Sequence, residues 1–277
     1  MAVVAMTPQK AAADAAKPAT VLEVEGVAKR FWARDRVVTA LSETNLTVRD
    51  GEFLTIVGPS GCGKSTVLNL VSGLTEPSDG VVKLLGKRIS GVNRNVGYIT
   101  QQDNLFPWRT LRDNVALPLE LAGVPAGERK DRADGWIARV GLGGFENCYP
   151  HELSGGMRQR GNIIRTLIYE PKVILMDEPF GPLDAQTRIV LQDLLLSIWE
   201  KNRSTVLFVT HDLTEAIALA DRVVMMTTRP GRILRSDTVN IPRPRDVFSI
   251  QRNPEFQRLY DELWTDLAAQ VKNDGGH

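Results

Sequence analysis

A nine-residue segment has the composition and spacing of a loop that binds phosphate groups. It fills every fixed position of the pattern G-x-x-x-x-G-K-[ST] and consists of Gly58, Pro59, Ser60, Gly61, Cys62, Gly63, Lys64, Ser65 and Thr66. Its glycines allow successive backbone N–H groups to turn toward one polyphosphate. We expect Lys64 to reach the terminal phosphates and Ser65 to place its hydroxyl on Mg²⁺. An ordinary Gly-rich turn is the alternative, but an apolar run precedes the loop and a helical pattern follows it, as the motif requires.

Polar residues also follow three other apolar runs that we expect to be strands. In open parallel sheets, ligands bind beyond the carboxyl ends of the strands, which is where these residues would lie. Gln101 ends one run, Asp177 and Glu178 end the next, and His211 ends the third. We expect Asp177 to lie at the Mg²⁺ ion and Glu178 to accept a proton from, or orient, an attacking water. His211 would hydrogen-bond the terminal phosphate, and Asp212 and Thr214 after it can cap a helix that continues through residues 215–217. The alternatives are a solvated acidic strand end for the carboxylates and a structural role for the histidine.

A Ser-Gly-Gly stretch opens a second helix that has an anion-binding start. It comprises Ser154, Gly155 and Gly156, and helical spacing continues through residues 163–168. One nucleotide needs only one such loop around its phosphates. The spare terminus is therefore explained if it covers a nucleotide held by a second copy of the chain in a two-fold dimer. A capped helix start without a ligand is the alternative.

The periodicity of the sequence predicts an α/β fold around these residues. Alternating residues predict half-buried antiparallel strands that lead into the phosphate loop, with Asp50-Gly51 as a turn. Turn signals around a charged helical segment, near residues 126–140, predict a helical insertion between about 103 and 165. The expected antiparallel strands span 20–31 and about 37–57, two further strands span 81–89 and 96–100, and strands buried in a parallel sheet span 172–177, 206–211 and 223–226.

The last part of the chain predicts a hairpin and a helix. Residues 229–232, Arg-Pro-Gly-Arg, have Pro and Gly where a type II turn needs them. From Pro254 onward, one helical face is apolar and is expected to pack on its own domain. That face comprises Phe256, Leu259, Tyr260, Leu263, Leu267 and Val271.

Two adjacent aromatic residues are candidates for stacking on a nucleotide base. Phe31 and Trp32 lie on an expected strand, where neighbouring side chains point to opposite faces. Only one of them can stack on adenine, and a core Phe beside a surface Trp is the alternative. The residues by themselves leave this choice open.

The composition bounds the class of protein. The 277 residues carry 34 basic and 33 acidic side chains, so no overall field attracts nucleic acid or anionic lipid. No apolar run is long enough to span a membrane, so membrane attachment would need a protein partner. Cys62 and Cys148 fit no metal or redox spacing, which favours a reducing compartment. Residues 1–19 have the composition of a flexible tail rather than a signal peptide, and we expect a cytosolic location.

Together these motifs resemble the ATP-binding subunits of ABC transporters. The resemblance covers about residues 20–245, in family order. The matching motifs are GPSGCGKST as Walker A, Gln101 as Q-loop, LSGGMRQR as signature, VILMDE as Walker B, residues 181–184 with Asp184 as D-loop, and His211 as switch histidine. Segments 98–103, 105–110, 180–188 and 229–233 are similar to those of nitrate, sulfonate and taurine importers.

The resemblance implies a mixed-sheet core with an N-terminal antiparallel region and an inserted helical subdomain. It implies a domain at 20–246, a helical subdomain at about 103–165 and a C-terminal helix at 247–277. ATP and Mg²⁺ are the implied cofactors, with Lys64, Gln101, Glu178 and His211 catalytic. Nucleotide would contact Phe31, residues 58–66, Asp184 and the Ser154–Gly156 stretch, and the implied metal ligands are Ser65, Gln101 and Asp177.

The resemblance also implies partners. These are a second copy, transmembrane permease subunits contacted just after Gln101 and, indirectly, an extracytoplasmic solute-binding protein, at the cytoplasmic face of the inner membrane. No nucleic acid is expected. The short stretch after the last strand leaves no room for the sensory domain of some relatives. Cys62 occupies a variable loop position, so we expect thiol alkylation to block ATP binding and prior ATP to protect.

Three other functions compete with an importer ATPase. An exporter ATPase would use the same motifs. A non-transport ATPase of this fold typically carries a coiled coil or two cassettes, and neither is found here. A small-molecule kinase lacks the signature. The transported solute and the permease cannot be read from this chain.

Overall fold

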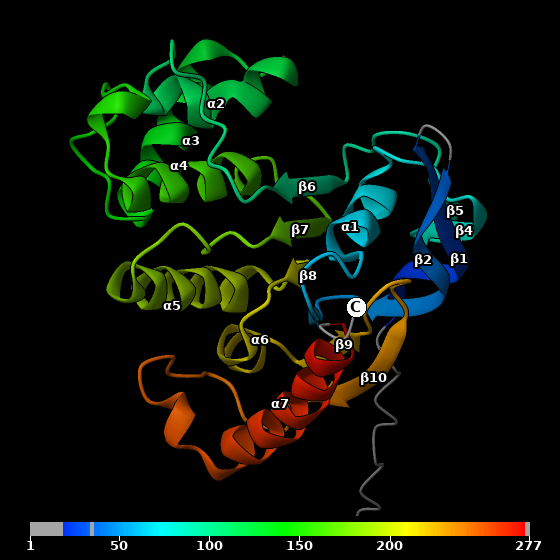
Figure 1. The fold of residues 1–277 in the computed structure, drawn as a ribbon. Helices are drawn as coiled ribbons and strands as arrows, with labels where there is room; N and C mark the ends of the chain where they lie inside the picture. The colour runs from blue at the N-terminus through cyan, green and yellow to red at the C-terminus, as the bar shows by residue number, and fades with distance from the viewer. Residues whose placement is uncertain (1–18, 34–35, 275–277) are drawn as a thin grey trace, which may run out of the picture.

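The computed structural model describes residues 19–33 and 36–274. Ten strands form two sheets, and seven α-helices and two short 3-10 helices surround them within the described residues. Figure 1 shows α2, α3 and α4 together beyond β6, with the four-stranded sheet on the opposite side, beside α1. Within residues 19–33 and 36–274, no helix combines the length and the apolar character needed to cross a bilayer.

The four-stranded sheet is antiparallel and has the order β2-β1-β4-β5. Its strands are β1 (Thr20–Ala33), β2 (Arg36–Arg49), β4 (Asp79–Leu84) and β5 (Lys87–Arg88). The expected antiparallel N-terminal region is therefore present. The strand expected at 81–89 is divided, because a turn at Leu85 and Gly86, both with positive φ, separates β4 from β5.

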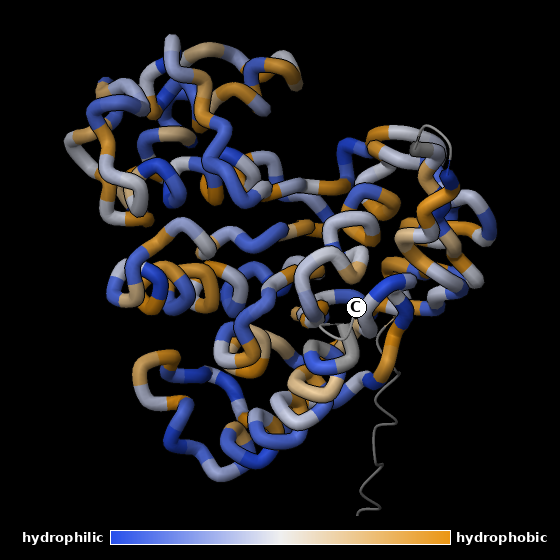
Figure 2. Tube along the Cα trace, in the orientation of Figure 1, coloured by the Kyte–Doolittle hydropathy of each residue, from blue (hydrophilic) through white to orange (hydrophobic). Residues whose placement is uncertain are grey.

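The six-stranded sheet has the order β10-β9-β3-β8-β7-β6 and is mixed. Five strands run parallel, and only β10 pairs antiparallel, with β9. The strands are β3 (Phe53–Val57), β6 (Val96–Ile99), β7 (Val173–Asp177), β8 (Thr205–Val209), β9 (Arg222–Met226) and β10 (Ile233–Thr238). Figure 2 shows hydrophobic segments in the strands at the centre of the molecule.

One sequence-based expectation about these strands is wrong. Residues 53–57 were expected to continue the half-buried antiparallel region, but β3 lies between β8 and β9, pairs parallel with both and is buried along its whole length. The Asp50-Gly51 turn is present, with Gly51 at φ 68°, and it leads the chain from one sheet into the other. The unbroken apolar run of β3 is the pattern of a strand covered on both faces.

The central strands supply two hydrophobic clusters, one on each face of the sheet. Ile174 and Met176 of β7 belong to the cluster that holds most of the helices, whereas Val173 and Leu175 belong to the cluster beneath the four-stranded sheet. This follows from the alternation of side chains along a strand. Each buried strand therefore joins both halves of the core.

The helices lie in the connections between the strands and after the last strand. Between β6 and β7 the chain forms the expected helical region. The helices are α1 (Lys64–Ser72), α2 (Leu111–Leu121), α3 (Ala126–Arg139), η1 (Pro150–Glu152), α4 (Gly155–Leu167), α5 (Ala185–Asn202), α6 (Leu213–Leu219), η2 (Ile250–Arg252) and α7 (Pro254–Asp274). The sequence analysis identified the region of α3 and the starts of α1, α4, α6 and α7, but not α2 or α5.

Helix α7 packs against α6 of its own chain. Phe256, Leu259 and Leu263 are buried, and Tyr260 and Leu267 pack against them, as the apolar face indicated. The side chain of Val271 lies outside the described residues.

The expectation of a type II turn at residues 229–232 is wrong. β9 and β10 form the hairpin, but Gly231 does not have the positive φ that this turn requires. The glycine is needed for close packing instead, because a Cβ there would lie 1.9 Å from the carbonyl oxygen of Cys62. Gly231 also accepts a backbone hydrogen bond from Ser42, which ties this segment to β2.

A buried arginine fixes the segment after β10 to the end of α6. Arg245 is 7% exposed, and burial lowers its pKa to about 10, so it is still charged at neutral pH. Helix ends leave carbonyl groups without partners, and a cation there is favourable. The guanidinium donates to the carbonyl oxygens of Ile217, Ala218, Ala220, Val239 and Ile241.

We predict that Arg245→Met lowers the free energy of unfolding by about 3 kcal/mol, because it leaves buried carbonyl groups without a donor. Urea unfolding followed by circular dichroism measures the change. Arg252→Met, at an exposed position of η2, is the control. Equal unfolding midpoints for the two variants would contradict this role of Arg245.

Cys62 is buried in the cluster beneath the four-stranded sheet. It is 1% exposed, and burial raises the pKa of its thiol. The expectation that a thiol reagent reaches Cys62 in the folded protein is therefore not supported, because only the thiolate reacts and the sulfur faces the core. Cys148 is partly exposed.

We predict that Cys148 reacts with a thiol reagent before Cys62, and that Cys62 reacts at the rate of unfolding. Labelling over time, followed by mass spectrometry of the peptides, gives both rates. In denaturant the two residues should react at similar rates. Rapid labelling of Cys62 under native conditions, with or without ATP, would show that the thiol is accessible.

Candidate functional site

The predicted site residues lie along one edge of the six-stranded sheet. β3, β8, β7 and β6 are neighbours and run parallel, so their carboxyl ends meet at this edge. The phosphate loop follows β3, His211 follows β8, Asp177 and Glu178 end β7, and Gln101 follows β6. Ligands bind beyond this edge in open α/β sheets.

The phosphate loop has the backbone of an anion cradle. Gly61 and Gly63 have φ of +77° and +100°, a region that glycine adopts without strain. No hydrogen bond among the described residues uses their amides. A Cβ at Gly63 would lie 2.7 Å from the side chain of Leu41, so packing also requires glycine there. The loop therefore presents free N–H groups at the start of α1.

Lys64 lies across this loop. It is 6% exposed, and its Nζ donates to the carbonyl oxygens of Gly58 and Pro59 at 2.8 and 3.0 Å. It makes no ion pair with a carboxylate among the described residues. A buried ammonium group with only carbonyl partners is suited to a phosphate, which would supply the opposite charge.

Ser65 and Asp177 form an oxygen pair beside the loop. Ser65 Oγ donates to Asp177 Oδ1 at 3.2 Å, and burial is the main cause that raises the pKa of the Asp177 carboxyl. A bound cation would offset the free-energy cost of burying the charged Asp177 carboxylate. No group of three or more His, Cys, Asp or Glu side chains within the described residues is placed to hold a metal. The pair fits Mg²⁺, which is commonly held by one or two protein groups together with substrate phosphates.

Tyr98 is a neighbour of this pair that the sequence analysis missed. Its hydroxyl lies 3.5 Å from Asp177 Oδ2 and 3.3 Å from Asn69 Oδ1. Burial, followed by the charge of Asp177, raises the pKa of the Tyr98 hydroxyl. Tyr98 lies in a segment already noted for its likeness to importers, but its contact with Asp177 depends on the pairing of β6 with β7, which no local pattern gives.

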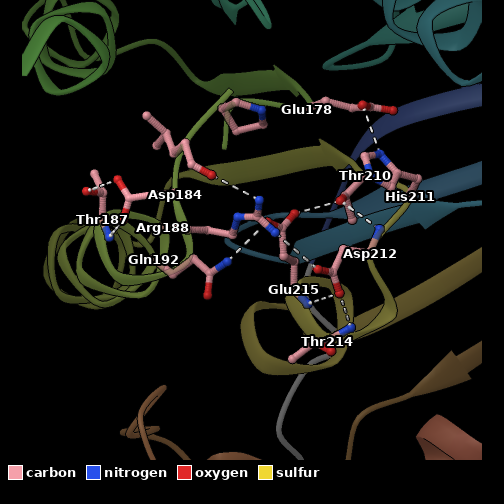
Figure 3. Close-up of polar contacts among 12 residues, drawn as sticks. Glu178, Asp184, Thr187, Arg188, Gln192, Thr210, His211, Asp212, Thr214 and Glu215 are labelled. Atoms are coloured by element: carbon pink, nitrogen blue, oxygen red, sulfur yellow. Dashed lines mark hydrogen bonds and ion pairs between the residues drawn. The ribbon is translucent and has the colours of Figure 1, made fainter. Parts of the chain in front are cut away.

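Glu178 and His211 are in direct contact. His211 Nδ1 and Glu178 Oε2 are 3.0 Å apart, as Figure 3 shows. The His211 side chain is 61% exposed, whereas that of Glu178 is 23% exposed. Glu178 has a positive φ of 45°, which is strained for a residue with a side chain, and its N–H donates to Val209 of β8. Such strain is typical of functional sites.

The Ser-Gly-Gly stretch starts α4, as expected. Ser154 Oγ accepts the N–H of Met157 at 3.3 Å, so the helix is capped as the alternative interpretation proposed. A Cβ at Gly156 would lie 2.6 Å from Thr187 of α5, so this glycine allows two helices to approach. A Cβ at Gly155 would meet only the end of the Arg158 side chain, at 3.9 Å, which is an ordinary contact. The structure therefore shows a cap and leaves the remaining amides of the terminus open to a ligand.

Gln101 and the start of α4 line a common groove of about 500 Å³, together with Pro182 and Leu183. Gln101 Nε2 lies 3.4 Å from the position of a Cβ on Gly181, and Gln101 makes no hydrogen bond to Ser65 or Asp177. Asp184 caps α5, because its carboxylate accepts the N–H groups of residues 186 and 187. These hydrogen bonds lower the pKa of the Asp184 carboxyl.

Both aromatic candidates are exposed on β1. Trp32 is 85% exposed and Phe31 is 42% exposed, with the Lys29 amine 5.0 Å from the centre of the Phe31 ring. They pair with Val37 and Val38 of β2. The interpretation that Phe31 is a core residue is therefore wrong, and which ring stacks on adenine stays a prediction.

Two residues near the site carry polar contacts that the sequence analysis did not assign. Arg188 of α5 and Glu215 of α6 lie close to His211, and a small cavity of about 30 Å³ lies among them. Arg188 lay within a segment already noted for its likeness to importers, but its contacts depend on how α5 and α6 pack. No local pattern identifies them.

Comparison with known proteins agrees with this geometry. The sequence profile of the ABC transporter family matches residues 41–181. An uncharacterized ABC transporter ATP-binding protein of Methanocaldococcus jannaschii is 50% identical over 89% of this chain and 94% of the relative. An aliphatic sulfonates import ATP-binding protein of Bacillus cereus is 44% identical over 82% of this chain and 90% of the relative. A nitrate import ATP-binding protein of Synechocystis is 42% identical over 87% of this chain and 93% of the relative.

Solved structures give the same result. A dimeric ATP-binding cassette in a post-hydrolysis state, bound to ADP and Pi, has a TM-score of 0.71 and 32% identity, and it covers 80% of this chain and 100% of the cassette. The mixed sheet and the antiparallel N-terminal sheet expected from the resemblance are confirmed. The family profile, the relatives along most of the chain and the arrangement of the strand ends show that this chain belongs to the ABC transporter family, as one of its ATP-binding, ATP-hydrolysing subunits.

Proposed function

We propose that this ATPase works as a dimer that energises an importer of a small solute such as nitrate, a sulfonate or taurine. The observation that carries the hydrolytic part is the Glu178–His211 contact at 3.0 Å on strands next to the phosphate loop. This contact supports Glu178 as the base and His211 as the residue that orients it, at the sheet edge where the loop would present the terminal phosphate of ATP.

The roles of the side chains follow from this arrangement. Glu178 accepts a proton from the attacking water or orients it, and His211 holds Glu178 and hydrogen-bonds the terminal phosphate. Lys64 leaves its carbonyl partners for the phosphates. Mg²⁺ would be held by Ser65 and Asp177, with Gln101 as a third ligand, and it would neutralise charge on the phosphates. Phe31 stacks on the adenine.

The signature helix serves the nucleotide of a second copy. In one chain α1 packs against strands of both sheets, whereas α4 lies with α2 and α3 in the helical region beyond β6 and packs mainly against α2. The two helix starts therefore belong to different parts of the structure. A two-fold dimer would bring Ser154–Gly156 and Asp184 of each copy to the loop of the other. The dimeric cassettes of similar fold support this arrangement.

Transport needs a membrane partner. We propose that permease subunits contact the residues after Gln101, at the cytoplasmic face of the inner membrane, and that a solute-binding protein delivers the solute on the other side. The relatives named for sulfonate and nitrate import support this assignment. For this role we divide the chain into a nucleotide domain at 20–246, with its helical subdomain at about 103–165, and a C-terminal part at 247–277 that contains α7.

We predict that Glu178→Gln lowers the rate of ATP hydrolysis by about 10²-fold or more, because general bases typically contribute that much. Phosphate release at saturating ATP measures the rate. The variant should form a dimer with ATP and Mg²⁺ in light scattering, since binding is kept while hydrolysis stops. Glu43→Gln, at an exposed position of β2, is the control.

A Glu178→Gln variant that hydrolyses ATP near the wild-type rate would remove Glu178 from the mechanism. A variant that is inactive but stays monomeric at saturating ATP would keep Glu178 as the base and contradict the shared dimer site. The two results are therefore separable.

We predict that Lys64→Ala weakens ATP binding by about 10- to 100-fold, because hydrogen bonds to charged groups contribute about 1.5–3 kcal/mol. Equilibrium titration with a fluorescent ATP analogue gives the affinity. Lys87→Ala, on the exposed strand β5, should bind as the wild type does. Retained affinity in a folded Lys64 variant would argue against the phosphate-loop assignment.

A further inference from the structure

Arg188 contacts the D-loop on one side and two carboxylates that follow His211 on the other. It lies in the first turn of α5, and its Nη2 donates to the carbonyl oxygen of Leu183 at 3.1 Å. Its Nη1 lies 3.6 Å from Asp212 Oδ2, and its Nε lies 3.8 Å from Glu215 Oε1. Figure 3 shows the guanidinium extending from α5 toward these two carboxylates on α6.

Glu215 is a buried carboxylate that needs a cation. Its side chain is 6% exposed, and burial is the main cause that raises the pKa of its carboxyl. It accepts hydrogen bonds from Thr210 Oγ1 at 2.6 Å and from Gln192 Nε2 at 3.2 Å, both of which are neutral donors. Arg188 is the cation paired with it in the structure. The guanidinium therefore offsets part of the cost of burying this charge.

The contacts of Arg188 reach residues on both sides of His211. Thr210, which bonds Glu215, precedes the histidine, and Asp212, which caps α6, follows it. A shift of the guanidinium would change the forces on Thr210 and Asp212, the two residues next to His211 in the chain. The His211 ring in turn contacts Glu178 at 3.0 Å. Polar contacts thus lead from Leu183 through Arg188 to Asp212, Glu215 and Thr210. The backbone of Thr210 and Asp212 joins them to His211, whose ring contacts the Glu178 carboxylate.

The ion pairs of Arg188 are not fully formed in this structure. Its Nε is buried and has no hydrogen-bond partner among the described residues, although Glu215 Oε1 is 3.8 Å away. A cavity of about 30 Å³ lined by Arg188, Glu215, His211 and Glu178 leaves room for a small movement. A short displacement of Leu183 and Arg188 would bring these donors within hydrogen-bond distance of the carboxylates.

We infer that Arg188 is a positioning residue that couples the D-loop to the His211–Glu178 pair, so that hydrolysis depends on Arg188 although it does not touch nucleotide. This inference rests on the proposed roles of Glu178 and His211. In a dimer, contact of the partner chain with residues 181–184 would shorten the distances from Arg188 to the carboxylates of Asp212 and Glu215. His211 would then be held in the position that hydrolysis requires. ATP binding itself would not need Arg188.

The test compares Arg188→Gln in two backgrounds, the wild-type chain and the His211→Ala variant. In the wild-type chain we expect kcat to fall about tenfold, a change of about 1.4 kcal/mol in the barrier, with KM for ATP within about twofold. In the His211→Ala background Arg188→Gln should change the remaining rate by less than about twofold, because contacting residues are not additive. Lys201→Gln removes a charge from the exposed end of α5 and is the control.

Equal losses in both backgrounds would overturn the inference, because Arg188 would then act independently of His211. An unchanged kcat in the wild-type background, or a rise in KM without a fall in kcat, would also overturn it. If Arg188→Gln does not fold, Glu215→Gln replaces it, because this variant keeps the shape of the carboxylate that Arg188 contacts. It must also lower kcat and leave KM for ATP within about twofold. Glu178→Gln is measured in parallel, and an active variant there would contradict the proposed base rather than the coupling.

Discussion

The parallel alignment of β3, β8, β7 and β6 is the constraint on which the rest of the structure depends. Parallel neighbours place their carboxyl ends at one edge, and each of these four strands ends in a residue with a polar task. The backbone hydrogen bond from Glu178 to Val209 extends this pairing one residue past β7. It holds Glu178 in a strained conformation and brings its carboxylate to His211 on the next strand.

Several charges at this edge are only partly compensated. Lys64 is bonded to carbonyl groups, Asp177 to a hydroxyl, and Arg188 has an unused buried donor. Buried charges without full partners reduce stability, and proteins keep them where a ligand or a moving segment supplies the partner. By contrast, Arg245 at the far end of α6 is surrounded by carbonyl acceptors. The stable end of α6 can thus anchor the end that carries the histidine.

Close helix packing decides the character of the signature terminus. Gly156 allows α4 to approach Thr187 of α5, and Asp184 caps α5 at the same place. Ser154 uses its hydroxyl to cap α4, so a ligand there would meet mainly backbone N–H groups. The signature opens α4, and the D-loop leads into α5, which carries Arg188, so all three lie at or near the starts of two helices in close contact.

Features that depend on local spacing could be predicted from the residues alone. The phosphate loop, the residues at the strand ends, the apolar face of α7 and the cap of α6 by Asp212 all follow from patterns within a few residues, where covalent geometry limits the outcome. The resemblance to the ATP-binding subunits of ABC transporters rests on the same patterns. The roles of the individual site residues stay predictions, although the structure brings most of them to one edge.

Features that depend on neighbours distant in sequence became visible in the folded chain. β3 joins the parallel sheet because β8 and β9 flank it, and Gly231 is required by the backbone of Cys62, not by a type II turn. The Cys62 thiol turns into a core formed by the antiparallel sheet. The contacts of Arg188 likewise exist only when α5 and α6 are packed. Burial and ion pairing are sums over contacts between separate segments, and a single stretch of sequence does not contain them.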